Sequence, residues 1–407
     1  MQVNIPKIHP PKIRAPKIRP PKIQQRKPEI IIGIPTYNEA DNIEELVKTL
    51  DEGLRKYFPN KKALIVNADA NSSDGTKKLF MSTKTKTPKK CMKVPRGKGA
   101  GVKELLGYFL SKDSAETLMM VDGDVRSVTP RWVRNMITPI LKGFDHNFPI
   151  FNRQEFDGSV TDHLAYPVMR GIMGINIRQP LAGEVALSKR AVDRIYNRGW
   201  PLRADKYGID VFMSFSSVLG ELRVAESYLG MKEHDLSEPK LGGMFEDVAT
   251  SLFELLDENR GFWDGRLRIR KPPIFFKDTR TTKYPLVEMD YRDIKALAKE
   301  EFKAVKRDIR RIVGKEQFEK LEKVFKKNGK LYIGTEDWVK IIFAFACAQG
   351  VKPNKRAKVM RPLYYARFLS FYKDYLDKEH KVAEQGIIKQ AELAYEQREE
   401  LIAKERA

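Results

Sequence analysis

Short apolar segments alternate with amphipathic segments along the first third of the chain, and this alternation strongly constrains its fold. Ile30–Pro35 has the length and β-branching of a buried strand, and the stretch from Asp41 to Leu54 has apolar residues at helical spacing. The same order continues, with strands expected over 63–66, 91–94 and 117–121 and helices over 74–80 and 102–110. Continuous apolar strands between helices predict an α/β, Rossmann-like domain with a parallel sheet covered on both faces. The first strand is not followed by Gly-x-Gly-x-x-Gly, so no dinucleotide site is expected.

An acidic pair, Asp122-Gly123-Asp124, directly follows the strand expected over 117–121. The carboxyl edge of such a sheet is where α/β domains bind their ligands. Two carboxylates without partners would be costly there, so we expect them to hold a divalent cation through oxygen ligands. Such a cation can neutralise the diphosphate of a nucleotide sugar. A solvated turn is the alternative, because Asp and Gly both favour turns.

Polar residues also follow the other expected strands. Glu39 and Asp69 lie in the first two of these loops, where they can accept hydrogen bonds from a base or a ribose. Arg96-Gly97-Lys98-Gly99 precedes the helix expected over 102–110; its glycines allow a close backbone approach, and Lys98 can reach a phosphate. The segment is not a P-loop, because no Ser or Thr follows the lysine. A helix N-cap in the first loop and a flexible surface loop at the glycines are the alternatives.

Three further candidate site residues, Glu184, Asp210 and His234, lie between residues 126 and 260. Glu184 follows the small-residue turn that starts at Gln179, and Asp210 precedes a mostly apolar helix. A helix N-cap is equally open for Asp210. His234 lies downstream of Asp124, and imidazole is a ligand for Mn²⁺ and similar ions. A structural role is the alternative for this lone histidine.

The composition excludes several classes of protein. With 407 residues, 42% of them hydrophobic and 32% charged, the chain fits two or three globular domains and not a disordered protein. Its apolar runs are too short to span a bilayer and its start lacks the apolar region of a signal peptide, so we expect a cytoplasmic protein with no transmembrane segment. Its two cysteines, Cys91 and Cys347, provide neither a disulfide framework nor a zinc spacing.

The net charge of +22 favours anionic partners without choosing among phosphorylated metabolites, nucleic acid and anionic lipid. Part of the excess comes from a Pro-Lys-Ile repeat in residues 1–28, which predicts an extended basic arm. A basic nucleic-acid-binding protein is therefore the non-enzyme alternative. That alternative leaves the acidic pair unexplained, so no nucleic-acid partner is expected.

The chain becomes helical and rich in Lys and Glu beyond about residue 290. Aromatic residues line one face of an expected helix there: Tyr364, Phe368, Phe371 and Tyr375. Such a stripe is typical of a core or of a contact between subunits, so a homo-oligomer through the C-terminal helices is one expectation.

Together these motifs resemble mannosylglycerate synthase, a family of retaining, metal-dependent glycosyltransferases with the GT-A fold. The motifs with the family's order and approximate spacing are Arg96-Gly97-Lys98-Gly99, Asp122-Gly123-Asp124, Gln179–Glu184, Tyr207–Asp210 and Met231–His234. The resemblance covers roughly residues 29–260, and similar motifs occur in the glucosyl-3-phosphoglycerate synthases. It implies a nucleotide-sugar-binding half over 29–125 and an acceptor-binding half over 126–285. The basic arm over 1–28 has no counterpart in the family, and a helical C-terminal region is expected over 286–407.

The resemblance implies roles in metal binding, donor binding, catalysis and acceptor binding. The ligands of a Mg²⁺ or Mn²⁺ ion would be Asp124 and His234. The residues around the nucleotide-sugar donor would be Glu39, Asp69, Lys98 and Asp122. The catalytic candidates beside the donor sugar would be Glu184 and Asp210. The residues that bind a small hydroxy-acid acceptor would be Arg153 and Thr161.

The implied reaction is transfer of a hexose, first of all from GDP-mannose, to D-glycerate, which gives a mannosylglycerate-type compatible solute. The first two loops depart from the family's pattern, and the loop that contains Asp69 is closer to that of the inverting relatives and the phosphoglycerate enzymes. Transfer from a nucleotide-glucose to 3-phosphoglycerate is therefore the runner-up, and it would need further cations such as Arg170 or Arg178. A third alternative is an inverting enzyme with Glu246-Asp247 as general base and a polyprenyl phosphate acceptor.

Overall fold

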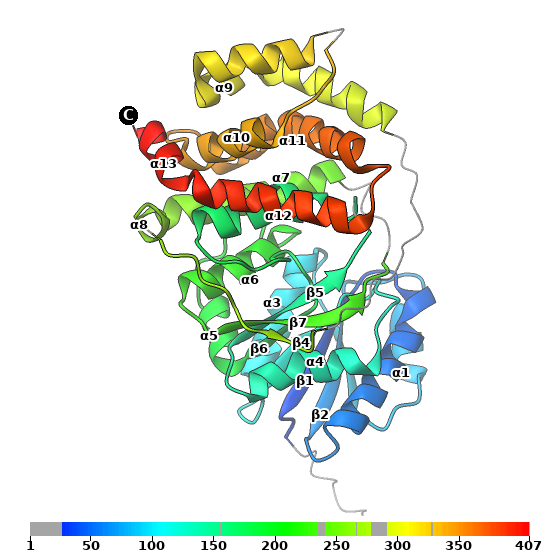
Figure 1. Ribbon diagram of the computed structural model, residues 1–407. Coiled ribbons are helices and arrows are strands. Elements are labelled where there is room, and N and C mark those ends of the chain that lie inside the picture. The colour runs from blue at the N-terminus through cyan, green and yellow to red at the C-terminus, as the bar shows by residue number, and fades with distance from the viewer. Residues whose placement is uncertain are drawn as a thin grey trace, which may run out of the picture.

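A mixed sheet flanked by helices forms the centre of the computed structural model, which describes residues 27–154, 156–234, 241–265, 267–277, 291–326 and 329–406 (Figure 1). Most of the arm predicted over 1–28 lies outside these residues. The sheet has eight strands in the order β3-β2-β1-β4-β6-β5-β7-β8. Their bounds are β1 Ile30–Thr36, β2 Ala63–Asp69, β3 Lys89–Lys93, β4 Thr117–Met120, β5 His146–Asn152, β6 Val185–Ser188, β7 Val224–Met231 and β8 Ile274–Phe275.

Because of the direction of β6, the segment before it lies at the same edge of the sheet as the loops that follow β4, β5 and β7. β6 runs antiparallel to its neighbours β4 and β5, whereas the other paired strands are parallel. Because β6 is reversed, the residues that precede it lie at the carboxyl edge of the other strands. Met120 at the end of β4 pairs with Val185 at the start of β6, and Asn152 of β5 pairs with Met231 of β7. The segments after β4, β5 and β7 and before β6 therefore meet.

Helices cover both faces of the sheet, as the alternation of strands and helices predicts. Ile30, Ile32 and Ile34 of β1 pack with apolar residues of α1 and α4, whereas Ile31 points to the opposite face and joins the core formed with α3, α5 and α6. The bounds of these helices are α1 Ala40–Tyr57, α2 Thr76–Ser82, α3 Lys98–Leu110, α4 Pro130–Leu141, α5 Lys189–Tyr196 and α6 Gly208–Leu219. The predicted α/β class is confirmed.

The C-terminal region is helical, as predicted, and stacks on α6 and α7 at one end of the molecule (Figure 1). Two short π-helical segments, η1 (Thr161–Ala165) and η2 (Val168–Ile172), lie between β5 and β6, and α12 packs against η2. α9 changes direction at Gly314, whose φ of 77° is not helical. The helices are α7 Leu241–Glu258, α8 Arg260–Trp263, α9 Arg292–Phe325, α10 Thr335–Cys347, α11 Pro353–Tyr375, α12 His380–Glu396 and α13 Arg398–Arg406.

The aromatic stripe of α11 packs inside the molecule. Tyr364 stacks on Phe245 of α7 with ring centroids 4.3 Å apart, and its hydroxyl lies 2.6 Å from the hydroxyl of Ser159. Phe371 packs edge-on against His163 of η1. These contacts account for most of the stripe as core, so the expected homo-oligomer gains no support from it.

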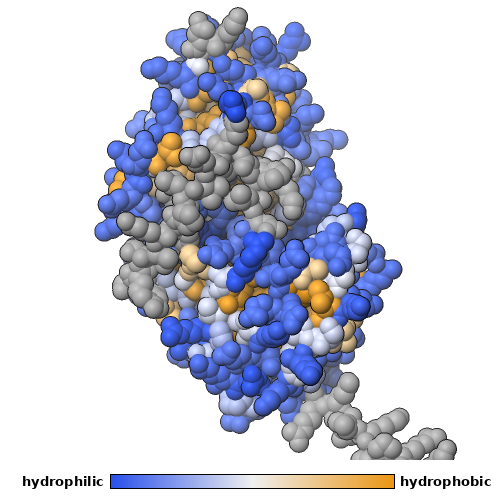
Figure 2. Space-filling model, turned by 90° about the vertical axis from the view of Figure 1, so that its right-hand side faces the viewer, coloured by the Kyte–Doolittle hydropathy of each residue, from blue (hydrophilic) through white to orange (hydrophobic). Residues whose placement is uncertain are grey.

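The surface carries few large apolar side chains. Figure 2 shows a mainly hydrophilic face with hydrophobic residues in small, separate areas. Among the residues that the structure describes, no helix has both the length and the apolar character needed to cross a bilayer.

Candidate active site

The Asp-Gly-Asp loop leaves β4 beside the loop that enters β6. The side-chain amide of Asn42 in α1 donates to the carbonyl oxygens of Gly123 and Val125 at 2.8 and 2.9 Å, which fixes the turn. A Cβ atom on Gly183 would lie 2.1 Å from Asp122 Oδ2, so only glycine allows the second loop to come this close to the carboxylate. The two motifs therefore form one site, and a turn held on two sides is not the freely solvated alternative.

Lys98 joins two of the predicted carboxylates. Its Nζ atom donates to Asp122 Oδ2 and to Asp210 Oδ2, each at 2.9 Å. Burial lowers the pKa of Lys98, but the charges of Asp122 and Asp210 outweigh it and raise this pKa well above its usual value. A charged ammonium group thus ties together the start of α3, the loop after β4 and the first turn of α6.

The helix starts on either side of this ammonium group explain its position. A Cβ atom on Gly99 would lie 1.8 Å from the carbonyl oxygen of Ala204, so glycine lets α3 begin against the segment that precedes α6. The N-cap of α6 is Tyr207, and Asp210 lies inside the helix with its side chain on Lys98. The N-cap alternative for Asp210 is therefore wrong, and the loop at Gly97–Gly99 packs against the protein.

A second ion pair lies at the same edge of the sheet. Lys232 Nζ donates to Glu184 Oε2 at 2.7 Å, and both side chains are buried. Sequence reasoning did not select Lys232, although it lies two residues before His234 in a motif that was selected. We define the lysine–carboxylate cluster as Lys98, Asp122, Glu184, Asp210 and Lys232.

The cluster has more carboxylates than ammonium groups, and this excess of negative charge contributes to raised pKa values among its acids. Burial and the charges of Asp122 and Glu184 raise the pKa of Asp210 to about 6 in spite of Lys98. Burial and the charge of Asp122 also raise the pKa of the neighbouring Asp124. One carboxylate oxygen each of Glu184 and Asp210 is buried without a hydrogen-bond partner in the part of the chain that the structure describes.

This excess of buried carboxylate oxygen fits a divalent cation, which prefers oxygen ligands. The charge of His234 acts to lower the pKa of both Asp122 and Asp124. Within the described ranges, however, no three His, Cys, Asp or Glu side chains are gathered around one point as a ready metal site. Asp124 and His234 accordingly stay predicted ligands.

His234 lies in contact with Arg153, the predicted acceptor ligand. His234 Nε2 is 2.9 Å from Asp157 Oδ2 and 3.3 Å from Arg153 Nη2. Arg153 donates to the same Asp157 oxygen through Nε at 3.1 Å and Nη2 at 2.9 Å. Although burial opposes it, the charges of Arg153 and His234 hold the pKa of Asp157 far below its usual value. Asp157, which sequence reasoning missed, therefore links the predicted metal ligand to the predicted acceptor ligand.

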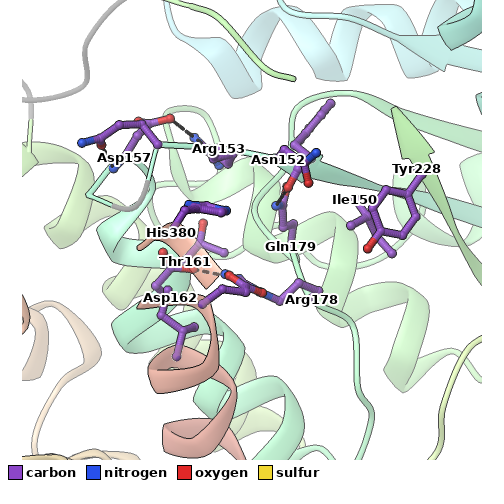
Figure 3. Close-up of a pocket in the computed structure, with 14 residues that line it drawn as sticks. Ile150, Asn152, Arg153, Asp157, Thr161, Asp162, Arg178, Gln179, Tyr228 and His380 are labelled. Atoms are coloured by element: carbon purple, nitrogen blue, oxygen red, sulfur yellow. Dashed lines mark hydrogen bonds and ion pairs between the residues drawn. The ribbon is translucent and has the colours of Figure 1, made fainter. Parts of the chain in front are cut away.

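Arg153 and Thr161 line one cavity of about 90 Å³, which the N-terminal part of α12 closes (Figure 3). Arg178 forms another part of its wall and donates to Asp162 at 2.8 Å and to both carboxylate oxygens of Glu384 at 2.7 Å. We call this cavity the arginine pocket. Its lining residues are Ile150, Phe151, Asn152, Arg153, Gln154, Asp157, Thr161, Asp162, Arg178, Gln179, Tyr228, His380, Glu384 and Ile387.

The predicted donor residues Glu39 and Asp69 lie at the same sheet edge. A Cβ atom on Gly123 would lie 2.9 Å from Glu39 Cγ, so Glu39 packs against the Asp-Gly-Asp loop. Asp69 is the buried last residue of β2, and its Oδ1 accepts from the backbone N–H of Ser72 at 3.0 Å. The first loop does not supply its own helix cap: the backbone N–H of Ala40 donates to Asp74 Oδ2 at 2.9 Å. The loop after β2 thus holds the loop after β1 in place.

The acids of the inverting alternative are bound by arginines. Glu246 lies 2.9 Å from Arg361 Nη1, and Asp247 lies 3.7 Å from Arg203 Nε. Both acids belong to α7, near the helical end of the molecule. Neither lines the arginine pocket.

Comparison with known proteins agrees with the motifs. Residues 60–256 match the family model described as mannosylglycerate synthase, GT domain. This part of the chain is therefore similar to the glycosyltransferase domain of the mannosylglycerate synthases. The mannosylglycerate synthase of Rhodothermus marinus is 26% identical over 163 residues, which are 39% of this chain and 40% of that protein.

Two other proteins match parts of the chain. The dolichol-phosphate mannosyltransferase of Pyrococcus furiosus is 25% identical over 181 residues, which are 41% of this chain and 48% of that protein. The chain therefore spans less than half the length of these relatives. A crystal structure of glucosyl-3-phosphoglycerate synthase from Mycobacterium tuberculosis, in complex with Mn²⁺, uridine diphosphate and phosphoglyceric acid, aligns with 56% of this chain and 78% of its own, at 21% identity and a TM-score of 0.46.

Proposed function

We propose that this protein transfers a hexose from a nucleotide sugar to a small hydroxy acid, with retention of configuration at the anomeric carbon. GDP-mannose is the first donor to test and D-glycerate the first acceptor. One observation carries the proposal: Arg153 Nη2 lies 3.3 Å from Nε2 of His234, the proposed metal ligand. A pocket suited to an anion thus opens directly beside a site suited to a diphosphate and its cation. The similarity of residues 60–256 to the mannosylglycerate synthases supports the same reaction.

The two halves of the site would bind the two substrates. The nucleotide would lie along the carboxyl edge, with Glu39 and Asp69 near the base and ribose and Lys98 near the phosphates. Asp124 and His234 would hold a Mg²⁺ or Mn²⁺ ion, which supplies Lewis-acid stabilisation of a departing diphosphate. The Mycobacterium enzyme is in complex with Mn²⁺ in its crystal structure; for this chain the support is the excess of carboxylate oxygen.

Arg153 would orient the acceptor. Its planar guanidinium can bind both oxygens of a carboxylate. In this structure its Nε and Nη2 atoms both donate to one oxygen of Asp157. Thr161 would hydrogen-bond the same acid from the pocket wall. An acid held at two points presents its hydroxyl group to the donor in a fixed direction, which lowers the entropic part of the barrier.

In the transfer step, the bond between the anomeric carbon and the phosphate oxygen breaks as the acceptor hydroxyl oxygen bonds to that carbon. The hydroxyl proton passes to the departing phosphate oxygen on the same face of the sugar, so configuration is retained. Glu184 and Asp210 would contact the sugar hydroxyls beside this centre. Asp210, with a pKa of about 6, is ionised at neutral pH and is the best placed group to stabilise positive charge at the anomeric carbon.

The Pyrococcus relative raises a polyprenyl phosphate acceptor as a second class. The arginine pocket argues against it, because a cavity of about 90 Å³ suits a small acid. Glu246 and Asp247, the bases that this alternative would use, are paired with arginines.

A donor-by-acceptor turnover screen tests the proposal. GDP-mannose, GDP-glucose and UDP-glucose are each combined with D-glycerate, 3-phosphoglycerate or a short polyprenyl phosphate, in the presence of Mg²⁺ or Mn²⁺. Released nucleotide and product mass are measured. We expect transfer to D-glycerate. Transfer only to 3-phosphoglycerate would support the runner-up, and the absence of transfer to either acid would refute the proposal.

A further inference from the structure

The C-terminal helix α12 contributes charge to the arginine pocket. Glu384, His380 and Ile387 line the cavity, and all three belong to α12, outside residues 60–256. Glu384 is the only one of the three with a carboxylate. Its pKa is lowered mainly by Arg178, although burial opposes this, so Glu384 is negatively charged at neutral pH.

A phosphorylated acceptor would need cations in addition to Arg153, and the candidates in the sequence were Arg170 and Arg178. Carboxylates of α12 bind both of them. Arg178 forms a bidentate pair with Glu384, at 2.7 Å for each bond. Arg170 Nη2 lies 2.9 Å from Glu392 Oε1, two turns further along the same helix.

Arg178 has little capacity left for another anion. Its third donor, Nη1, is 2.8 Å from Asp162 Oδ1, and its guanidinium lies over the ring of Tyr166 at 5.1 Å from the centroid. The guanidinium side chain is only 14% exposed. Two carboxylates therefore face one guanidinium group at this wall, so the wall does not attract an anion.

The side of the pocket formed by Arg153 has fewer carboxylates than the side formed by Arg178. Arg153 pairs with Asp157 alone among the carboxylates whose bonds to it are described, and it lines the cavity, so we expect it to accept one further carboxylate. An acid with a single anionic group can bind there and direct its uncharged end towards Arg178 and Glu384. A second, doubly charged group at that end would lie beside the Glu384 carboxylate, which is repulsive in a poorly hydrated cavity.

We propose that Glu384 of α12 is a specificity-determining residue that excludes phosphorylated acids from the arginine pocket and restricts the acceptor to an acid with one anionic group. This inference rests on the proposed function, because it assumes that the arginine pocket receives the acceptor. The discrimination arises from a repulsive element placed against the competing ligand.

The test compares Glu384→Gln with wild type and with Glu392→Gln as a matched control. Glutamine keeps the length of the side chain and an oxygen that can accept from Arg178 but removes the charge. Glu392→Gln removes the same charge from the same helix at a residue that does not line the pocket. Binding of D-glycerate and of 3-phosphoglycerate to each full-length protein is measured by isothermal titration calorimetry, with matched thermal unfolding midpoints as a check on folding.

Wild type should bind D-glycerate more tightly than 3-phosphoglycerate. Glu384→Gln should tighten 3-phosphoglycerate binding by about tenfold or more and change D-glycerate binding much less, whereas Glu392→Gln should change neither. The proposal is overturned if Glu384→Gln leaves the ratio of the two dissociation constants unchanged, if wild type prefers 3-phosphoglycerate, or if wild type binds neither acid. Failure of the proposed function is a separate result, since the acids would then bind without hexose transfer in the turnover screen.

Discussion

The two halves of the site neutralise buried charge in opposite ways. In the lysine–carboxylate cluster, Lys98 and Lys232 hold an excess of carboxylates at the edge of the sheet. In the arginine pocket, carboxylates hold Arg153 and Arg178. We expect the first arrangement to attract a cation and the second to make Arg153 available to an anionic substrate. The lysine–carboxylate cluster is therefore positioned by the sheet edge and the starts of α3 and α6, whereas the arginine pocket also depends on how α12 docks.

The largest expected effect falls on the proposed metal ligands. Asp124→Ala and His234→Ala should each lower metal-dependent kcat/KM by about 10³-fold or more, because the departing diphosphate loses its main charge stabilisation. The loss of Mn²⁺ binding should be visible by electron paramagnetic resonance with no substrate present. A variant that still binds Mn²⁺ with wild-type affinity would remove that residue from the metal site.

Asp210→Asn should lower kcat by about 10²-fold while changing the KM for the acceptor little, because Asp210 contacts Lys98 and not the arginine pocket. The pH profile provides a second readout. The pKa of Asp210 is about 6 in the absence of substrate, so wild-type kcat/KM should fall as the pH drops below that value. An equal rise in acceptor KM would place Asp210 on the acceptor side instead.

Glu226→Gln tests the cost of buried charge behind the arginine pocket. Glu226 Oε1 accepts from the backbone N–H of Arg178, and burial raises the pKa of Glu226 to about 7 from the usual 4.5. Because the pKa of Glu226 is higher in the folded state, protonation of Glu226 stabilises the folded protein. This stabilisation is fully present below about pH 4.5 and is lost as the pH rises through about 7. Between these pH values the free energy of unfolding of the wild type should therefore fall by up to about 3 kcal/mol. That of Glu226→Gln should not show this fall.

Urea unfolding of both proteins at pH 5 and pH 8 measures this difference. Other acids with raised pKa values, such as Asp162, titrate in both proteins and cancel in the comparison. If the free energies of unfolding of the two proteins differ by the same amount at both pH values, Glu226 does not carry the effect.

The smallest expected effect is that of Arg153→Lys. Lysine keeps the charge but cannot bind two carboxylate oxygens in one plane, so the KM for the acid should rise about tenfold with the KM for the donor unchanged. Steady-state kinetics with each substrate varied in turn would measure both constants. An unchanged acceptor KM would exclude Arg153 from acceptor binding.

Much of the fold followed from local pattern. The apolar stretch at Ile30 and the helical spacing after Asp41 correspond to β1 and α1, because a strand buried on both faces needs a continuous apolar run. The reversal of β6 was not predictable, since Val185–Ser188 is short and its direction is set by pairing with β4. That reversal is what brings Glu184 to the site.

Some residues of the candidate site could also be predicted from the sequence, and others could not. Asp122, Lys98 and Asp210 lie in motifs next to predicted strands and helices, and the structure brings them into direct contact. Glu384 carries no local signal, because a glutamate in a Lys/Glu-rich helix is typical of a solvated surface. Its partner Arg178 is 206 residues away in the sequence, and only the docking of α12 joins them.

The most direct test of the proposed transfer is to incubate GDP-mannose and D-glycerate with Mg²⁺ and either wild type or Asp124→Ala, and to analyse the product by mass spectrometry and NMR. We expect wild type to form a hexosylglycerate whose anomeric configuration matches that of the donor, and Asp124→Ala to form almost none. An inverted product, or equal product from both proteins, would contradict this expectation.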